Sequence, residues 1–273
     1  MTRFWVDGVE NGTIPHDNRS LMYGEGVFET LRIVDGRIPL LETHWRRVRS
    51  AAVQLGMAIS IESAELFLQT IDLSSLQWLR LQWSPRSTGR GYGAQDNVAY
   101  CQLLAWGGAD LSHQSGAVKL VSLTTQLPQR SFSSGLKMVS AAEYSHAAAE
   151  LKGLAQDQQL TDGLLLSAQG DVIETTRSNL FFIGSEGIVT PCLNDHGVSG
   201  VMRSVVIDYA KAQSWPLSIR PVSQQELGSF QSVYLSNALM GCAPVTQIDH
   251  HHYQDSKHYD LQSLTRELGF NND

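Results

Sequence analysis

The sequence predicts an α/β protein with two domains. Strand-like and helix-like segments alternate along the chain, and 273 residues exceed the length that one typical hydrophobic core organises. A polar stretch rich in Gly and Ser, near residues 107–116, divides the chain into two halves. We therefore expect a smaller N-terminal α/β domain at residues 1–107, a linker at residues 108–116 and a C-terminal domain at residues 117–273.

The composition limits the classes of partner. With 42% hydrophobic and 17% charged residues the chain resembles ordinary globular proteins, and its net charge of -7 argues against nucleic acid or an anionic membrane as a partner. The three cysteines lack C-x-x-C spacing, and no apolar signal segment follows Met1, so we expect free thiols and a cytoplasmic location. No carboxylate or Cys stands at ligand spacing beside residues 250–252, so this His triplet predicts an exposed turn and no metal.

In the N-terminal half, alternating apolar residues predict strands, and apolar residues three and four apart predict helices. The expected strands are residues 4–9, the later part of 23–34, 78–83 and 98–106, and the expected helices are 41–55 and 61–71. Because side chains alternate along a strand, Phe28, Thr30 and Arg32 share one face. These side chains suit a polar pocket, and an exposed sheet face is the open alternative.

The helix predicted at residues 41–55 carries His44 and Arg47 three positions apart, beside its apolar stripe. Two interpretations are open. Together with Arg46 and Arg49 these residues suit a solvated stripe. Alternatively, Arg47 binds an anion.

In the C-terminal half we expect strands at residues 117–123, 163–167 and 232–236, a helix at 141–160 and a hairpin at 172–183 that carries Glu174. The sequence GVSG at residues 197–200 opens a further helix. A helix N-terminus presents unpaired N–H groups, and glycine lets an anion approach the backbone. This segment therefore suits a phosphate site, although most such turns only start a helix.

The chain has five lysines, at positions 119, 137, 152, 211 and 257. Lys137 alone lies at a strand-to-helix transition among small and apolar residues, where desolvation favours the neutral, nucleophilic amine. The other four are expected on polar surfaces. Lys137 is therefore the candidate nucleophile.

Seven short motifs follow one another along the chain: DNR at 17–19, YGEGVFE at 23–29, HWRR at 44–47, GLK at 135–137, GDVIE at 170–174, SNLF at 178–181 and GVSGVMR at 197–203. In this order and spacing, they resemble the fold-type IV pyridoxal-phosphate (PLP) enzymes, the class-IV aminotransferase superfamily. The resemblance spans nearly the whole chain and implies a larger C-terminal PLP-binding domain with a barrel-like sheet. Arg177, between Glu174 and Asn179, and the long helix predicted at 141–160 depart from the pattern.

The resemblance implies a role for each matching position. Lys137 would attach PLP through its amine, and Glu174 would pair with the pyridine nitrogen, so that the ring acts as an electron sink. Arg47 and the backbone N–H groups of Val201 and Met202 would bind the phosphate. The remaining positions are Asn237 and Ala238 at the phosphate end, and Phe28, Thr30, Arg90 and Tyr92 facing the substrate.

Within the superfamily, GRGY at 89–92, the phosphate loop at 197–203 and SNALM at 236–240 resemble the 4-amino-4-deoxychorismate lyases. This resemblance implies conversion of aminodeoxychorismate to 4-aminobenzoate and pyruvate for folate synthesis, with Arg90 and either Arg32 or Arg86 holding the two substrate carboxylates. It also implies a homodimer. Two alternatives are an aminotransferase acting on branched-chain or D-amino acids and a non-catalytic ligand-binding module.

Overall fold

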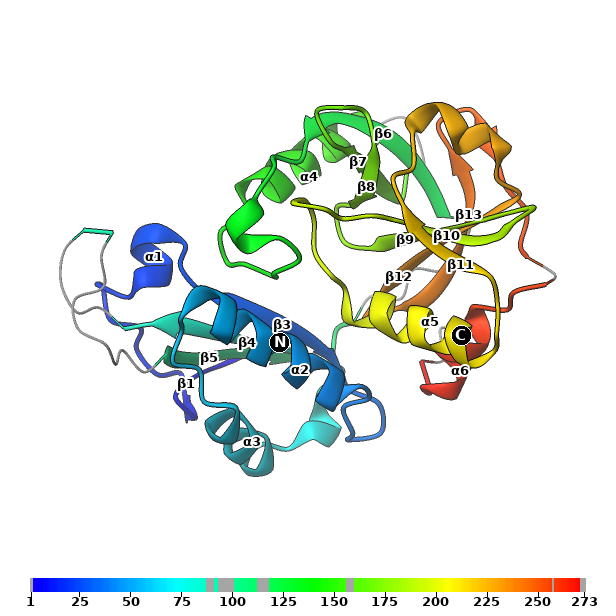
Figure 1. Ribbon diagram of the computed structural model, residues 1–273. Helices are drawn as coiled ribbons and strands as arrows, with labels where there is room; N and C mark the ends of the chain where they lie inside the picture. Colours follow the sequence, from blue (N-terminus) through cyan, green and yellow to red (C-terminus); the bar gives the residue numbers. More distant parts are fainter. Residues whose placement is uncertain are drawn as a thin grey trace. The chain divides into compact units, whose positions relative to one another are not determined.

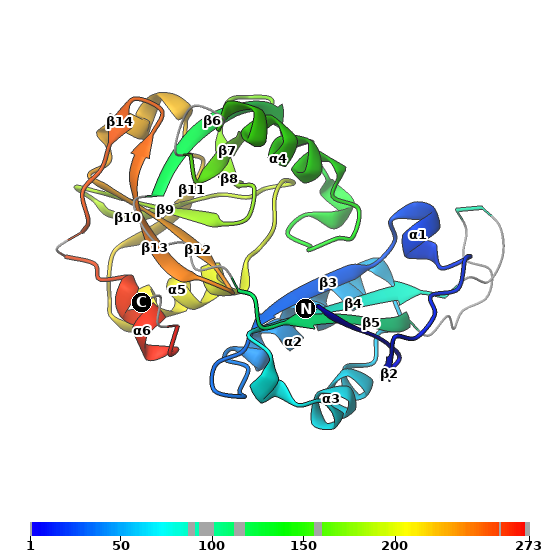
Figure 2. The same ribbon diagram turned by 180° about the vertical axis from the view of Figure 1, so that it is seen from behind.

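The structure is a computed structural model that describes residues 2–86, 91–92, 101–111, 118–155, 160–256 and 258–270. The chain forms two compact units, one of residues 1–112 and 136–140 and the other of residues 113–135 and 141–273. Each unit combines helices with one β-sheet, which confirms the predicted α/β class (Figures 1 and 2). The segment 136–140, which contains Lys137, groups with the N-terminal unit.

The N-terminal unit is built on a five-stranded antiparallel sheet with the strand order β2-β1-β5-β4-β3. Its strands are β1 (Arg3–Val6), β2 (Val9–Glu10), β3 (Val27–Arg32), β4 (Trp78–Pro85) and β5 (Cys101–Gly108). Its helices are α1 (Arg19–Tyr23), α2 (Leu41–Leu55) and α3 (Ile61–Thr70), with a 3₁₀ turn at Leu73–Ser75. Helix α2 packs on β3, and its Trp45 lies edge-on to Trp83 of β4 in the core.

One expected strand of this unit is wrong. Residues 4–9 form a hairpin, because β1 ends at Val6 and β2 begins at Val9. Asp7 and Gly8 between them have φ angles of 49° and 83°, the positive values that a two-residue type I′ turn requires. Asp-Gly is a favoured pair for this turn and indicated a hairpin. The alternation of apolar residues across positions 4–9 led instead to the prediction of one continuous strand.

The C-terminal unit contains a mixed sheet that curls along the order β11-β10-β9-β12-β13-β6-β7-β8, with β14 beside β13 (Figure 2). Its first strands are β6 (Val118–Gln126), β7 (Asp162–Leu166), β8 (Val172–Thr175), β9 (Asn179–Gly184) and β10 (Gly187–Pro191). The others are β11 (Leu217–Arg220), β12 (Ser232–Asn237), β13 (Gly241–Ile248) and β14 (His251–His252). The His triplet, expected as an exposed turn, thus leads into a short strand.

Three helices pack against strands of this sheet. They are α4 (Ala142–Leu154) against β6 and β7, α5 (Val201–Ala212) against β11 and β12, and α6 (Gln262–Glu267) against β13, with 3₁₀ turns at Ser131–Ser133 and Gln224–Ser229. The helix expected at 141–160 is wrong at its C-terminal end, since α4 ends at Leu154 and Leu160 is not helical. The Ala- and Gln-rich composition favours a helix, but Gly153 weakens its last turn.

The hairpin expected at 172–183 is also wrong in its pairing. Strand β8 pairs with β7, whereas β9 pairs with β10 and β12. Every residue of β8 is buried, and a strand that is buried on both faces carries no pattern that specifies its neighbour. A tight corner joins β8 to β9, with the N–H of Thr175 donating to the carbonyl of Ser178 at 2.8 Å.

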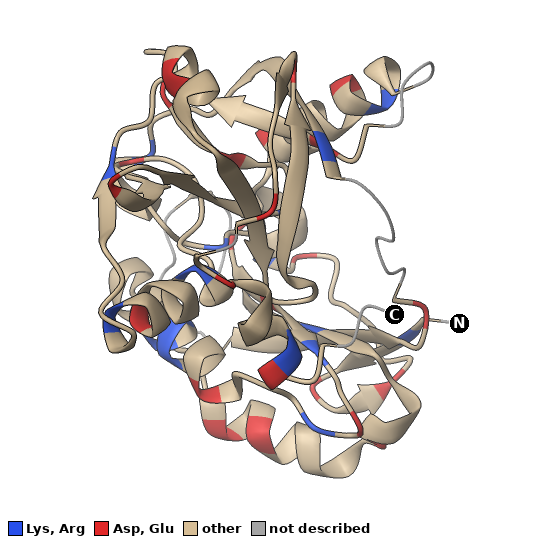
Figure 3. Cartoon of the chain, turned by 90° about the vertical axis from the view of Figure 1, so that its right-hand side faces the viewer, with Lys and Arg blue, Asp and Glu red and all other residues tan. Residues whose placement is uncertain are grey.

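Charged residues are sparse in the C-terminal sheet. Strands β9, β10, β12 and β13 carry no Lys, Arg, Asp or Glu. Figure 3 colours the basic residues blue and the acidic residues red along the chain. A buried acidic residue in this sheet is costly unless it is hydrogen-bonded, so Asp162 on β7 and Glu174 on β8 invite a functional or structural explanation. Among the described helices, none combines the length and the apolar character that a membrane span requires.

Candidate active site

Glu174 is the centre of a buried polar cluster in the C-terminal unit. The residue is only 3% exposed, and its carboxylate accepts hydrogen bonds from two sides. The hydroxyl of Tyr144 donates to Oε1 at 2.5 Å, while the Asn179 amide and the backbone N–H of Val198 each donate to Oε2 at 3.0 Å. Such donors favour the ionised form of a buried carboxylate. The cluster therefore favours a negative charge on Glu174 inside an otherwise sparsely charged sheet.

Asn179 ties this carboxylate to the loop before α5. Besides bonding Glu174, its amide nitrogen donates to the carbonyl of Val198 at 2.9 Å, and its oxygen accepts the N–H of Gly200 at 3.2 Å. A Cβ on Gly200 would lie 2.1 Å from this oxygen, and a Cβ on Gly197 would lie 3.1 Å from the Glu174 carboxyl carbon. The glycines predicted for a phosphate loop are thus needed to bring the loop against Asn179 and Glu174.

The first turn of α5 follows directly, and it is predicted to bind an anion through Val201 and Met202. Both side chains are buried, which fixes the start of the helix against the sheet. Gly200 is the N-cap, and it has no side chain that could accept a hydrogen bond from the first turn of the helix. The helix dipole adds a partial positive charge at this end. The arrangement suits a phosphate.

The turn after β12 carries the other two residues predicted for the phosphate end, Asn237 and Ala238. The Asn237 side-chain oxygen accepts the N–H groups of Leu239 and Met240, at 3.0 and 2.8 Å, and its amide donates to Ser178 Oγ at 3.0 Å. The bond to Ser178 connects this turn to the β8–β9 corner. The Asn237 turn is thus hydrogen-bonded to the corner that follows Glu174 in β8.

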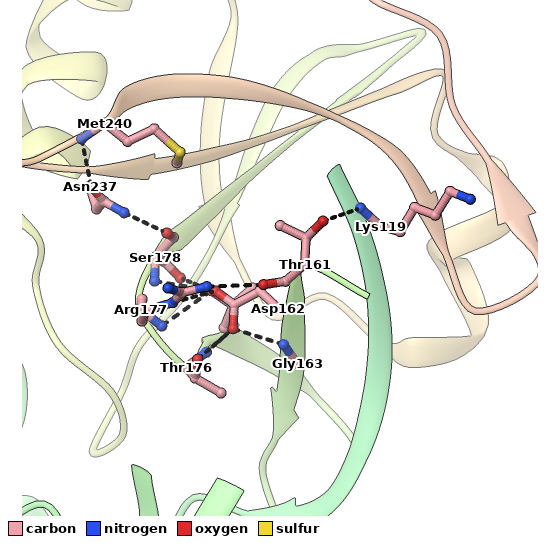
Figure 4. Close-up of polar contacts among 10 residues, drawn as sticks. Lys119, Thr161, Asp162, Gly163, Thr176, Arg177, Ser178, Asn237 and Met240 are labelled. Atoms are coloured by element: carbon pink, nitrogen blue, oxygen red, sulfur yellow. Dashed lines mark hydrogen bonds and ion pairs between the residues drawn. The ribbon is translucent and has the colours of Figure 1, made fainter. Parts of the chain in front are cut away.

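Asp162 organises the same corner, as Figure 4 shows. Its buried carboxylate accepts the hydroxyls of Thr175 and Thr176, at 2.8 and 2.5 Å, and the N–H of Gly163 at 2.8 Å. Arg177, which departs from the family pattern, donates to the carbonyl of Thr161 at 2.9 Å and lies 3.8 Å from Asp162. The Arg177 side chain is 64% exposed, so it closes the outer side of the corner and does not enter the cluster around Glu174.

The predicted nucleophile belongs to the N-terminal unit. The carbonyl of Lys137 accepts the N–H of Phe28 at 3.0 Å, and Met138 forms a β-bridge with Val27. The segment thus runs along the start of β3. The Lys137 ammonium nitrogen lies 4.5 Å from the centroid of the Phe28 ring, a cation–π contact that holds the side chain over this residue.

The sheet face that carries Phe28 and Thr30 also carries Arg80, which sequence reasoning missed. Arg80 lies opposite Thr30 in the β3–β4 register, and its guanidinium is 3.7 Å from the Phe28 ring centroid. It donates to the side-chain oxygen of Gln82 at 2.9 Å and forms no ion pair with a described carboxylate. Desolvation lowers the pKa of Arg80. A half-buried guanidinium that has no carboxylate partner among the described residues is suited to bind an anionic ligand.

Glu29 points to the opposite face, as the alternation predicts, and meets His44 and Arg47 of α2. Arg47 donates through Nε and Nη2 to its two carboxylate oxygens, at 2.7 and 2.5 Å, and His44 Nδ1 lies 2.6 Å from Oε2. Burial by itself raises the pKa of Glu29, but the charges and hydrogen bonds of Arg47 and His44 outweigh it and hold the pKa at about 2. His44 is 1% exposed, so the interpretation as a solvated stripe is wrong for this pair.

Glu29→Gln is expected to lower the free energy of unfolding of the N-terminal unit by about 3 kcal/mol at pH 7. The folded pKa of about 2 lies below the unfolded value of about 4.3, so the ionised carboxylate stabilises the fold above that value, and this contribution declines as the pH falls towards 2. Urea unfolding followed by tryptophan fluorescence reports on this unit, which contains Trp5, Trp45, Trp78, Trp83 and Trp106.

At pH 3.5 the stability difference between wild type and Glu29→Gln should shrink by about 1 kcal/mol. Glu42→Gln, which removes an exposed partner of Arg49 on the same helix, serves as the control and should change little at either pH. An equal difference at both pH values would show that the ionisation of Glu29 does not stabilise the fold.

Of the predicted substrate residues, Tyr92 contacts helix α1 of the N-terminal unit. Arg90 is outside the described residues. Tyr92 is 87% exposed, and its ring lies 5.4 Å from that of Tyr23. The buried Arg19 donates to the carbonyls of Gly91 and Tyr92, at 3.2 and 3.1 Å, and pairs with Glu25, so the DNR and YGEG motifs hold this short segment.

The structure therefore distributes the predicted residues between its two units. Glu174, Val201, Met202, Asn237 and Ala238 lie in the C-terminal unit, and Lys137, Arg47, Phe28, Thr30 and Tyr92 lie in the N-terminal unit. Tyr144 and Arg80 were not predicted, because their contacts depend on helix packing and on strand register.

The chain is similar to characterised proteins over nearly its full length. It is 28% identical to the aminodeoxychorismate lyase of Vibrio harveyi, across 90% of this chain and 91% of that protein. The solved 4-amino-4-deoxychorismate lyase of Pseudomonas aeruginosa, also 28% identical, superposes with a TM-score of 0.88 and covers 98% of both chains. The branched-chain amino acid aminotransferase of T.th., solved with pyridoxamine 5'-phosphate, is 19% identical, has a TM-score of 0.78 and covers 97% of this chain and 92% of that chain. The family model described as amino-transferase class IV matches residues 26–248, and the chain therefore belongs to the class IV aminotransferase family.

Proposed function

We propose that the protein is a PLP-dependent lyase that converts 4-amino-4-deoxychorismate to 4-aminobenzoate and pyruvate, a step of folate synthesis. One observation carries the proposal: the buried carboxylate of Glu174 accepts hydrogen bonds from Asn179 and from the backbone N–H of Val198, in the glycine loop that leads into the first turn of α5. The similarity to aminodeoxychorismate lyases, which extends over nearly the whole chain, supports the choice of reaction.

The residues of this cluster fit PLP. A fixed carboxylate suits a protonated pyridine nitrogen, and the first turn of α5 suits a phosphate dianion. The close packing of Gly197 and Gly200 against Glu174 and Asn179 holds these two features on one support. Arg47 is proposed as a further phosphate ligand, oriented through its two bonds to Glu29.

When bound, PLP supplies an electron sink that stabilises negative charge on the carbon next to the substrate nitrogen. Lys137 would attach the cofactor between turnovers, and its free amine would remove the proton from C4 of the substrate. Glu174 would keep the ring nitrogen protonated. As the C–O bond to the enolpyruvyl group breaks, Lys137 would return a proton to the methylene carbon of this leaving group. The substrate ring would leave as 4-aminobenzoate and the enolpyruvyl group as pyruvate, with no water or oxidant consumed.

The purified protein, loaded with PLP, is expected to release pyruvate and 4-aminobenzoate from aminodeoxychorismate in equal amounts. Pyruvate is measured by coupling to lactate dehydrogenase, and 4-aminobenzoate by its fluorescence. The alternative is an aminotransferase acting on branched-chain or D-amino acids, which the family also contains. Rapid glutamate formation from such an amino acid and 2-oxoglutarate, without pyruvate release from aminodeoxychorismate, would replace the lyase with this alternative.

Arg80 is proposed as an anchor for one substrate carboxylate, beside Phe28 and Thr30. Arg80→Gln is expected to raise the KM for aminodeoxychorismate about tenfold or more and to change kcat less, because a charged hydrogen bond made in both ground and transition states is lost. Initial rates of pyruvate release over a range of substrate concentrations give both constants.

Arg86→Gln is the matched control, because Arg86 pairs with Asp7 and its side chain is 58% exposed. Its KM should stay near the wild-type value. A tenfold rise for Arg86→Gln with none for Arg80→Gln would move the anchor to Arg86, which the sequence offered as a candidate.

We further propose that two copies form a homodimer and that the enzyme works in the cytoplasm. Family resemblance supports the dimer, and the three free cysteines suit a reducing compartment. Light scattering on the eluted protein tests the dimer, since a monomer mass at micromolar concentration would contradict it.

A further inference from the structure

Tyr144 lies on the first turn of α4 and contacts Glu174 from a different element than the other donors do. Its ring packs against the apolar cluster beneath α4, which includes Leu123, Leu165 and Ile173. Its hydroxyl donates to Oε1 of Glu174, whereas Asn179 and Val198 both donate to Oε2. The two oxygens are thus held by separate parts of the unit.

A glutamate side chain has several rotatable bonds, so hydrogen bonds to one oxygen alone still let the carboxylate pivot about that oxygen. A donor on the second oxygen removes that freedom and fixes the plane of the group. Each carboxylate oxygen has two lone pairs, so a carboxylate that accepts from several protein donors can also accept from a ligand. A carboxylate with a fixed plane and a full negative charge is what a protonated ring nitrogen requires.

The first turn of α4 is itself fixed to the phosphate-loop side of the unit. Helix α4 has no side-chain cap in the described structure, but Glu143 beside Tyr144 pairs with Arg130 at 2.7 Å. The backbone N–H of Arg130 donates to the carbonyl of Asp195 at 2.6 Å, two residues before the loop at 197–200 begins. The ion pair and backbone bond of Arg130 therefore connect the start of α4, which carries Tyr144, to the loop that carries the donor Val198.

The phenol can act only as a donor here. Burial first, and then the charge of Glu174, raise the pKa of Tyr144 far above the neutral range, so the hydroxyl keeps its proton. A permanent donor to a buried carboxylate favours the ionised carboxylate over the protonated one. Both the position of the Tyr144 hydroxyl and its retained proton therefore favour the ionised carboxylate of Glu174.

We propose that Tyr144 is the positioning residue of Glu174, which fixes Oε1 and keeps the carboxylate ionised towards the basic nitrogen of a bound PLP ring. The identity of the cofactor rests on the proposed function. The contact itself does not depend on which reaction the enzyme performs, so the lyase and aminotransferase alternatives leave this inference unchanged.

The test is a titration of the cofactor-free protein with PLP, followed by absorbance and without substrate. Tyr144→Phe removes only the hydroxyl and is expected to raise the Kd for PLP about tenfold, the effect of losing one hydrogen bond to a charged group. It should also shift the pH at which the absorbance band of bound PLP changes. A purely structural role would lower thermal stability without moving this pH.

Tyr234→Phe is the matched control, because Tyr234 also donates to a carboxylate, that of Asp255, within the same unit. Its Kd for PLP should equal that of wild type. In a Glu174→Gln background, the further change Tyr144→Phe should have little effect on the Kd, because Tyr144 acts through Glu174.

Equal PLP affinity and band pH in wild type and Tyr144→Phe would overturn the inference, as would an undiminished effect in the Glu174→Gln background. These outcomes are separate from the proposed reaction, which fails when a protein that binds PLP releases no pyruvate from aminodeoxychorismate. A wild-type protein that binds no PLP would overturn both.

Discussion

Lys137→Ala is expected to lower pyruvate release from aminodeoxychorismate by about 10⁴-fold. Lys137 has two proposed tasks, since its amine attaches the cofactor and then moves a proton between two substrate carbons. Alanine can do neither, and the change removes one side chain without disturbing the backbone bond from Phe28 to the carbonyl of residue 137. Steady-state rates with saturating PLP measure the loss.

The attachment can be measured independently of turnover. Borohydride reduction of the PLP-loaded wild type should add the mass of one reduced cofactor to the peptide that contains Lys137, and Lys137→Ala should gain none. Lys152→Ala is the control, because Lys152 is followed by Gly-Leu in a sequence that superficially mimics the lysine motif, but it is exposed on α4. Label on Lys152, or full activity in Lys137→Ala, would refute the assignment of Lys137.

Single helices and turns could be predicted because their sequence patterns lie within a few neighbouring residues. Helix α2 spans Leu41–Leu55 as expected, since its apolar stripe has helical spacing and Gly56 follows it in the left-handed conformation, with φ of 63°. The glycine loop before α5 could be located in the same way. Its function could not be seen from spacing alone, because the need for glycine arises from contacts with Asn179 and Glu174, far away in sequence.

Contacts across elements could not be predicted without register and packing. Arg80 lies fifty positions from Thr30, and only the β3–β4 pairing brings it beside Phe28 and its neighbours. The partner of Arg47 is Glu29, which the H-x-x-R pattern does not indicate. The family resemblance named Arg47 and Glu174 as functional residues, but the groups that orient them appear only in the folded chain.

Glu174→Gln is expected to lower kcat for pyruvate release by about 10³-fold, the second largest effect, while the borohydride label on Lys137 remains. Glutamine has nearly the same volume. Its oxygen can still accept from Asn179 and Val198, and its amide nitrogen can donate to the Tyr144 hydroxyl, so the cluster should stay packed. The neutral amide, however, no longer stabilises a protonated ring nitrogen, and the ring then loses most of its capacity to take up electrons. The loss belongs to the transition state, so KM should change much less than kcat.

Glu226→Gln is the control for this prediction. Glu226 lies in the same unit and, like Glu174, accepts from a side chain and a backbone N–H group, but its donors are Arg220 and Ser223. It should keep wild-type kcat. Near-normal kcat in Glu174→Gln would mean that the ring nitrogen needs no anionic partner, and the charge of Glu174 would then serve only to hold Asn179 and the loop at 197–200. Loss of the Lys137 label would instead place the defect in cofactor binding, because attachment requires only the amine and a correctly held cofactor. The label and the rate together therefore separate the electronic role of Glu174 from its structural one.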